Sequence, residues 1–588
     1  MAWGVTGPAE SASFKWKDCG GTIQSGACPV VSPGQVSLAW DRPTQYTDAS
    51  LLFGKTFILR YGTSSGVYPN AIDMTGDSDP AMISRVVTGL DIGTTYYFVV
   101  QTVDSEGFVS AQSVEFSSVA GAAPVIVDPT PTDTITQSDL PLAITVPGVY
   151  QITESLNWDT VGSAITVDAD NVTIYAATAD NIVFTVGTTV DASGIESLGQ
   201  NDGLTIHGFH LTTGGHLTTT STAQALIYTS NSGRAIDNLL VRDMEFTIGV
   251  SDANMTGTSS AYGAIVFRSP VGIGIIGDIY NCTFNLRGTK AGSGIRGVSL
   301  ESGGSAPYLK VYDNQFNCSD CSGTSTGYQR PIQGAHEVYG NTIDVTDCVF
   351  TGFGIVGINN FEYSHGNTFT ITNSNATRGV MMENDSTDKV CLYNAMNVVS
   401  TTGSGDCRLY RVRFGANNNN IGFSDFDGGS QSLGLACVDI YGTQVQYGDT
   451  RNNNIYHNSA SNSQHGIVSV REQVEDTYLW SNDAGTGNVY GIHLRSISSG
   501  ENANGMYLDG DTLSGSTADI RLQTDGAFPA CEATHFFGVG SVTVSNNDPA
   551  ETVEETDYWL PGDAGLIQHN RKNTGTKTPE APTNLRAA

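Results

Sequence analysis

The sequence predicts an all-β chain: a right-handed parallel β-helix solenoid preceded by a β-sandwich. Three observations predict this fold: an asparagine that returns at near-regular intervals, short alternating strands between the returns, and almost no helix signals. Of the 588 residues 68 are glycine, and only 15% are charged, which suits a turn-rich β protein. Acidic residues outnumber basic ones 59 to 27, and this excess argues against a nucleic-acid surface, which needs a basic footprint.

Residues 1–120 read as a separate β-sandwich. Gln35–Trp40 and Phe57–Tyr61 read as strands, and a third strand begins at Tyr96, six residues after Leu90 and with Gly-Thr between them. These features resemble the fibronectin type III family, with Tyr96 at its tyrosine-corner position. The resemblance covers about 85 residues and implies a binding or spacer module without catalysis. The usual Pro-rich first strand is missing.

A loop bracketed by Cys19 and Cys28 stands near that missing strand, and these two cysteines are candidates for a local disulfide in an oxidising compartment. Residues 121–140 carry Pro124, Pro129 and Pro131 among Thr and Asp and read as a short, stiff linker.

Residues 141–545 are assigned to the β-helix. Residues 141–175 contain Pro-Leu-Ala-Ile-Thr-Val-Pro-Gly-Val-Tyr and Ala-Ile-Thr-Val-Asp-Ala-Asp-Asn-Val-Thr-Ile. This resembles the entry segment of the pectin-lyase-like β-helix superfamily, and these first strands are expected to close the open end. Asparagine tolerates the left-handed backbone of a sharp corner, and stacked amides can bond from coil to coil. The predicted ladder consists of Asn281, Asn314, Asn341, Asn367, Asn394, Asn420 and Asn454.

A second set of residues, the charged column, follows short strands at intervals of one or two periods. It consists of Arg268, Glu301, Arg330, Glu383, Arg411, Asp439, Arg471 and Arg495. The superfamily resemblance implies that acidic polysaccharides are common ligands or substrates, so the column is a candidate glycan-binding face. The alternative is a ladder of alternating charges on a solvated edge, where each pair contributes about 0–1 kcal/mol.

Paired carboxylates were the candidates for hydrolysis. Asp425 with Asp427, Asp509 with Asp511, and Glu383 with Asp385 each place two carboxylates on one face of a strand or turn. Arg411 is the candidate to neutralise an acidic substrate. The polygalacturonase-type motifs are not found. A lyase would need a base, helped by Ca²⁺ or Arg, but regular calcium-loop spacing is absent and no other cofactor or metal is expected.

His207 and His210 are three apart in one predicted strand. They therefore fall on opposite faces, which is poor geometry for two ligands of one metal.

Residues 546–588 are expected to cap the far end and to continue as a tail. Residues 578–588 resemble the first strand of a fibronectin type III domain, although no domain follows. One alternative is a truncated domain. The other is strand donation to the N-terminal sandwich of the next subunit, which would build a filament.

Together these features favour an extracellular, cell-surface or virion appendage protein for adhesion, assembly or glycan binding. Its partners would be copies of itself, as filament or trimer, and a glycan or cell surface, and neither a membrane span nor a secretory signal is visible. The alternative is an enzyme, a polysaccharide lyase or a tailspike-like glycoside hydrolase that acts on an acidic glycan.

Overall fold

The computed structural model describes strands and short turns from Trp16 to Ala587. The longest stretches it does not describe are 1–15, 25–35, 42–55, 104–111, 121–128, 214–223, 442–449, 497–505, 525–533 and 556–582. The chain forms two compact units, one of residues 1–127 together with 559–588, and one of residues 128–558. Cys19 and Cys28 lie outside the described residues.

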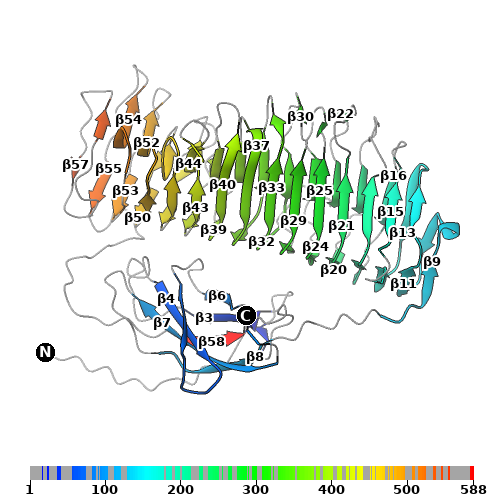
Figure 1. The fold of residues 1–588 in the computed structure, drawn as a ribbon. Coiled ribbons are helices and arrows are strands. Elements are labelled where there is room, and N and C mark those ends of the chain that lie inside the picture. The colour runs from blue at the N-terminus through cyan, green and yellow to red at the C-terminus, as the bar shows by residue number, and fades with distance from the viewer. Residues whose placement is uncertain are drawn as a thin grey trace. The chain divides into compact units, whose positions relative to one another are not determined.

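The larger unit is a parallel β-helix (Figure 1). Its first sheet has 15 strands and runs from β10 (Leu142–Ile144) to β56 (Val544–Asn546). Its second sheet has 16 strands and runs from β9 (Asp133–Ile135) to β57 (Glu554–Glu555). Its third sheet begins at β12 (Leu156–Trp158), ends at β51 (Asp483–Ala484), and carries the short side strands β30 (Ser322–Gly323) and β34 (Val349–Phe350). From β10 to β51 each coil passes through the first, second and third sheets in that order, and the strands between the two ends of a sheet pair with strands of the coils before and after them.

Alternation of side chains explains why the sequence winds this way. In the third sheet, inward positions hold Phe246, Phe284 and Phe316, which are fully buried, and their rings stack at 4.8 and 4.5 Å. The residues between them point outward and are polar, as a strand with one buried face requires. A parallel crossover in one sheet is right-handed in about 98% of proteins, which fits the predicted hand. The described residues contain one helical element, the 3-10 turn Gln137–Asp139.

An asparagine ladder connects the coils at the turn between the second and third sheets. Asn314 donates its backbone N–H and its side-chain amide to Asn341 Oδ1, at 3.1 and 3.0 Å. Asn341 donates in the same way to Asn367, at 3.0 and 3.0 Å, and Asn367 to Asn394, at 3.0 and 2.9 Å. All four are buried, so the ladder satisfies groups that water cannot reach.

Beyond Asn394 the ladder continues in other residues. Asn394 donates its backbone N–H to the Ser424 hydroxyl at 3.4 Å, and Ser424 donates to Asn458 at 3.1 Å. Asn458 bonds Asn482 at 3.0 Å, and Asn482 bonds Asp511 at 2.8 Å.

Three asparagines of the predicted ladder lie elsewhere. The residue that stands at the ladder position of this coil is Cys282, whose backbone N–H donates to Asn314 Oδ1. Asn281 comes one residue earlier and has a left-handed φ of 52°. Asn420 and Asn454 lie in strands of the second sheet, where Asn454 bonds Asn420 at 3.0 Å. The residue with positive φ also differs from the prediction. It is the one before the ladder asparagine, for example Asp313 at 52°. The ladder side chain is therefore free to bond the neighbouring coil.

The smaller unit contains two packed antiparallel sheets. One holds β58 (Thr583–Ala587), β3 (Val36–Asp41) and β6 (Met82–Val87) in that order. The other holds β5 (Asn70–Met74), β4 (Thr56–Gly62), β7 (Thr95–Val103) and β8 (Phe116–Val119). Both sheets contribute to one core, which includes Leu38, Leu59 and Phe98. The sandwich thus takes one strand from the C-terminal end of the chain.

Two predicted boundaries shift. Residues 133–135 were assigned to the linker, but β9 pairs with β11 (Gly148–Ile152) inside the β-helix. Residues 554–555 were assigned to the tail, but β57 pairs with β55 (Thr534–Phe537) and extends the second sheet.

Candidate ligand-binding surface

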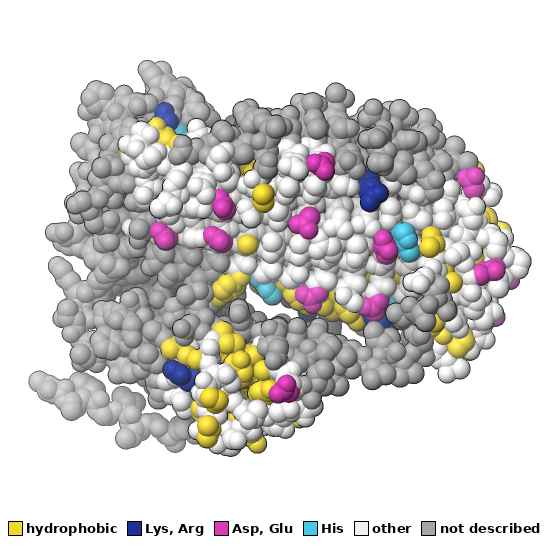
Figure 2. Space-filling model, in the orientation of Figure 1, with side chains coloured by type: hydrophobic (Ala, Val, Ile, Leu, Met, Phe, Trp, Pro, Cys, Tyr) yellow, Lys and Arg dark blue, Asp and Glu magenta, His cyan; other side chains and the backbone are white. Residues whose placement is uncertain are grey.

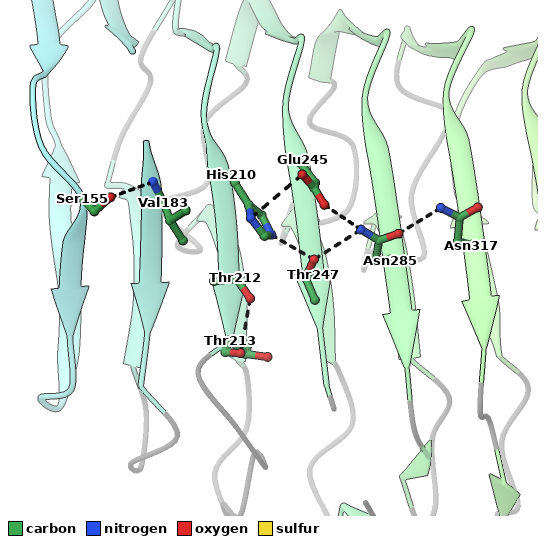
Figure 3. A network of polar contacts seen from close by, with 9 residues as sticks. All are labelled: Ser155, Val183, His210, Thr212, Thr213, Glu245, Thr247, Asn285 and Asn317. Carbon is green, nitrogen blue, oxygen red and sulfur yellow. Dashed lines mark hydrogen bonds and ion pairs between the residues drawn. The ribbon is translucent and has the colours of Figure 1, made fainter. Parts of the chain in front are cut away.

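The third sheet presents a flat polar face. Figure 3 shows part of it, where His210 Nε2 lies 2.9 Å from the Thr247 hydroxyl and Asn285 donates to Glu245 Oε1 at 2.9 Å. Asn317 donates to Asn285 at 2.9 Å, which extends the network to the next coil. The strands involved are β18 (His210–Thr213), β21 (Glu245–Ile248), β25 (Thr283–Arg287) and β29 (Gln315–Ser319).

This face is neutral to acidic. In Figure 2 the described surface of the β-helix is mostly uncharged polar side chains and backbone, with scattered acidic side chains and few basic ones. Among the described outward residues of the third sheet, Arg287 carries the one fixed positive charge. A polyanionic glycan would meet little attraction here.

Asp425 and Asp427 lie on this same face, in β43 (Asp425–Asp427). Asp425 accepts a hydrogen bond from the Ser459 hydroxyl. Asp427 Oδ1 accepts from the backbone N–H of Gly429 and from the Asn462 amide, both at 3.0 Å. Asp427 therefore stabilises the turn after its strand.

Part of the charged column is a buried ion network on the first sheet. Glu383 in β38 (Gly379–Asn384), Arg411 in β41 (Cys407–Arg413) and Asp439 in β44 (Gly434–Tyr441) are paired in register. Their exposed fractions are 2%, 6% and 0%. Arg411 lies 3.4 Å from Glu383 and 4.0 Å from Asp439, and Arg408 also pairs with Asp439. These side chains hold three coils together and do not form an exposed binding face.

The other members of the column are not in this register. In the two coils before Glu383, its register partners are Asn359 and Gln333. Arg330 lies three residues before Gln333 and is instead the register partner of Arg296. Ser469 and His493 occupy the places after Asp439, and Arg495 pairs with Gln523. The side chains of Arg268, Glu301, Asp385 and Arg471 lie outside the described residues.

The second sheet carries a feature that the sequence analysis missed. Tyr308 and Tyr363 are exposed by 59% and 43%, and both rings contact His336, at centroid distances of 5.1 and 5.6 Å. These three residues are called the tyrosine patch below. Tyr308 and His336 immediately precede β28 (Leu309–Tyr312) and β32 (Glu337–Tyr339), and Tyr363 begins β36 (Tyr363–His365), so the tyrosines are two coils, about 10 Å along the axis, apart.

Two ion pairs border the tyrosine patch. Lys310 lies 3.0 Å from Glu337, and Lys389 lies 2.6 Å from Glu362. Burial lowers the pKa of His336, an effect that outweighs the opposing influence of Glu337 and Glu362. His336 is therefore neutral at pH 7, and the charges around it are internally balanced.

A stack of aromatic rings runs beside the patch. Tyr280, Tyr312, Tyr339 and His365 stack coil on coil at 5.0, 4.7 and 4.8 Å, within 7° of parallel. Burial raises the pKa of Tyr339 far above its ordinary value. Each ring stands two residues before a ladder position, as in Tyr312 and Asn314, so the sequence does contain the signal. The stack fixes the strands that present the exposed tyrosines.

The described residues offer no candidate site for metal binding or for thiol chemistry. No group of three or more His, Cys, Asp and Glu there could hold a metal. His207 and His210 lie in different sheets, in β17 (Thr205–His207) and β18, which corrects their assignment to one strand. Six cysteines, including Cys318, are buried free thiols, while Cys321 is not described. No helix in the described part of the chain is long and apolar enough to span a membrane.

Comparisons with known proteins found remote likenesses among solved structures. No protein-family model matches the chain, and no curated protein sequence matches it. The chain is similar to the family 28 exopolygalacturonase of Yersinia enterocolitica, with 10% identity, 89% of this chain and 96% of that chain covered, and a TM-score of 0.28. It is also similar to the catalytic domain of a GH87 α-1,3-glucanase in complex with tetrasaccharides, with 12% identity, coverage of 88% and 90%, and a TM-score of 0.17.

The class of protein is therefore defined by strand pairing: an all-β, parallel β-helix solenoid. Likenesses this remote carry no argument about what the chain binds or cleaves.

Proposed function

We propose that this chain is a surface appendage protein, extracellular or on a virion, which adheres to glycans through the tyrosine patch. One observation carries the proposal: two exposed tyrosines stand two coils apart on a rigid sheet, with a neutral histidine between them. Tyrosine offers a large apolar face with a polar hydroxyl, which suits the alternating C–H and O–H surfaces of sugar rings. A spacing of about 10 Å is of the order of a disaccharide in an extended polysaccharide.

The ligand class that fits is a neutral polysaccharide. The lysines at the patch are already paired with Glu337 and Glu362, and the chain carries a formal net charge of −32. A uronate-rich glycan would be repelled by the protein as a whole and would find no unpaired basic residue among those just named.

The smaller unit is proposed to be a fibronectin type III-like module. Its three-on-four strand order supports this, as does the bond that the Asp91 backbone N–H donates to the Tyr96 hydroxyl at 3.1 Å. Modules of this kind bind partners or act as spacers. The smaller unit would therefore connect the β-helix to other subunits, and the proposal includes self-association.

The experiment is a titration of purified protein with neutral and uronate oligosaccharides. We expect a neutral glycan to bind. Tyr363→Ala and Tyr308→Ala should each weaken it at least about tenfold, or about 1.4 kcal/mol, while Tyr363→Phe keeps most of the affinity. Val399→Ala, at an exposed residue of the third sheet, is the matched control. Binding of uronates alone, or full affinity in both alanine variants, would contradict the proposal.

The alternative function, a lyase or glycoside hydrolase, is tested in the same samples. Glu383 is buried in an ion network, and the carboxylates of Asp425 and Asp427 accept hydrogen bonds from Ser459 and from Gly429 and Asn462, so all three acidic groups already have protein partners. We expect bound glycan to be recovered intact. New reducing ends or unsaturated products would instead favour the enzyme.

A further inference from the structure

The first step concerns the strand that completes the sandwich. β58 pairs antiparallel with β3, with Leu38 opposite Ala587, Ala39 opposite Arg586 and Asp41 opposite Thr583. Figure 1 shows β58 beside β3 within the smaller unit. On its other side β3 pairs with β6 over its whole length. β58 therefore occupies the one edge of β3 that would otherwise lack backbone partners.

The free edge of β3 needs another strand to pair with its backbone N–H and C=O groups. β3 buries Val36 and Leu38 almost completely, so its backbone is fixed by the core of the sandwich. An edge strand so fixed, with unpaired N–H and C=O groups, recruits another strand. β58 is the strand that the chain provides.

The next step is the length of the chain between donor and acceptor. The sandwich is joined to the first coil of the β-helix, and β58 follows the last coil. The second sheet has 16 strands, so its first and last strands are about 70 Å apart. The segment from Glu555 to Thr583 is 28 residues long. A chain of this length reaches about 90–100 Å when fully extended and about 30 Å on average as a coil.

From these observations we infer that β58 is donated to the β3 edge of a second copy of this chain. Reaching its own β3 requires this segment and the 14-residue connection from Val119 to Asp133 together to span the two ends of the β-helix, which lowers the effective concentration within one chain. A second chain can bring its sandwich next to the last coil of the first, and the segment need not extend. Each chain then gives one strand and accepts one, a heterologous contact that extends into a filament where its rotation does not close a ring.

This inference specifies the self-association that the proposed function includes. It is tested without any glycan, so its failure and the failure of glycan binding are separate outcomes.

The test is disulfide trapping in the full-length chain. Ala39→Cys and Arg586→Cys place two thiols at register partners, within the Cα separation that a disulfide allows. We expect mild oxidation to give a ladder of dimers, trimers and higher species on a non-reducing gel, increasing with protein concentration. The two single-cysteine variants measure the background from the ten native cysteines. Disulfides found only within one chain at every concentration, or no 39–586 disulfide at all, would overturn the inference.

A second variant protects the test against misfolding. Leu585→Pro removes a backbone N–H and fixes φ in the donor strand, and the β-helix contains no part of that strand. We expect Leu585→Pro to shift the native protein to monomers in light scattering and to keep its β-sheet circular dichroism. Leu585→Val is the matched control and should assemble like the native chain. Equal assembly of the proline variant would also overturn the inference.

Discussion

At the scale of single residues, the asparagine ladder uses both ends of each amide. Asn341 Oδ1 accepts from the backbone and side chain of Asn314, while its amide donates to the carbonyl of Val311 at 2.9 Å and to Asn367. Serine and aspartate can replace asparagine in the ladder, because Ser424 and Asp511 each accept a hydrogen bond from the backbone N–H of the preceding ladder residue. What the turn requires of each coil is an acceptor for the neighbouring backbone N–H.

The first residue-scale prediction is that Asn341→Ala destabilises the β-helix by about 2–6 kcal/mol. The substitution leaves the Asn314 N–H and the Val311 carbonyl without their side-chain partner in a buried turn, at about 1–3 kcal/mol each. Denaturant unfolding followed by circular dichroism measures the loss.

Asn420→Ala is the matched control, because Asn420 belonged to the predicted ladder and lies outside the real one. It gives up one side-chain bond, from Asn454, and should cost about 1 kcal/mol or less. Equal losses in the two variants would show that the ladder contributes no special stability.

At the scale of elements, the outward side of the second sheet combines aromatic packing with charge. His336 lies between two tyrosines and near Glu337, Glu362, Lys310 and Lys389. Burial lowers its pKa, and the two lysines act in the same direction while the two glutamates oppose them. The folded sheet therefore binds a proton at His336 less readily than the unfolded chain does.

This gives a prediction for pH dependence. A histidine whose folded pKa is depressed contributes stability above its unfolded pKa of about 6.5, and that stability is lost as the pH falls toward the folded value. We expect the thermal midpoint to drop between pH 7.5 and pH 5.5, and His336→Gln to reduce this drop. Asp278, whose pKa burial raises, acts in the opposite direction. An unchanged drop in the glutamine variant would assign the pH dependence to other groups.

The strands could be predicted from the sequence, since alternation and a recurring asparagine are local signals. The register between coils, which decides which residue stands at each ladder position, could not be predicted. Asn420 and Asn454 stand in asparagine-rich runs, and the ladder positions fall instead on Ser424 and Asn458, because coil length decides which residue reaches the turn. No local sequence pattern indicates how many residues a coil contains.

The candidate site was less predictable for a related reason. Glu383, Arg411 and Asp439 were correctly grouped by spacing, and the structure pairs them in register, but sequence does not show that other parts of the chain cover them. Tyr308 and Tyr363 lie two repeats apart and share no motif. Their exposure and their contact with His336 are properties of the stacked sheet.

At the scale of the whole β-helix, each coil touches only the coils before and after it. Stability in such a solenoid is approximately a sum of coil and nearest-neighbour terms, so damage to one coil should be felt locally. The buried cysteines report on this, because they are distributed along the axis: Cys282, Cys318, Cys348, Cys391, Cys407 and Cys437. Burial raises the pKa of Cys282, Cys318, Cys391 and Cys437, so these thiols react only when their coil opens.

The last prediction uses Phe369, which is fully buried in β37 (Thr368–Ala376) between Ile343 and Met396 of the adjacent coils. Phe369→Ala opens a cavity at a cost of about 3–5 kcal/mol. Thiol labelling read by peptide mass spectrometry should then accelerate most at Cys348 and Cys391 and least at Cys282, three coils away. Thr370→Ala, on the outward side of the same strand, creates no cavity and should leave every rate unchanged. A uniform acceleration at all six thiols would mean that the β-helix opens as one cooperative unit, because only coupling stronger than the nearest-neighbour terms could carry the damage to both ends.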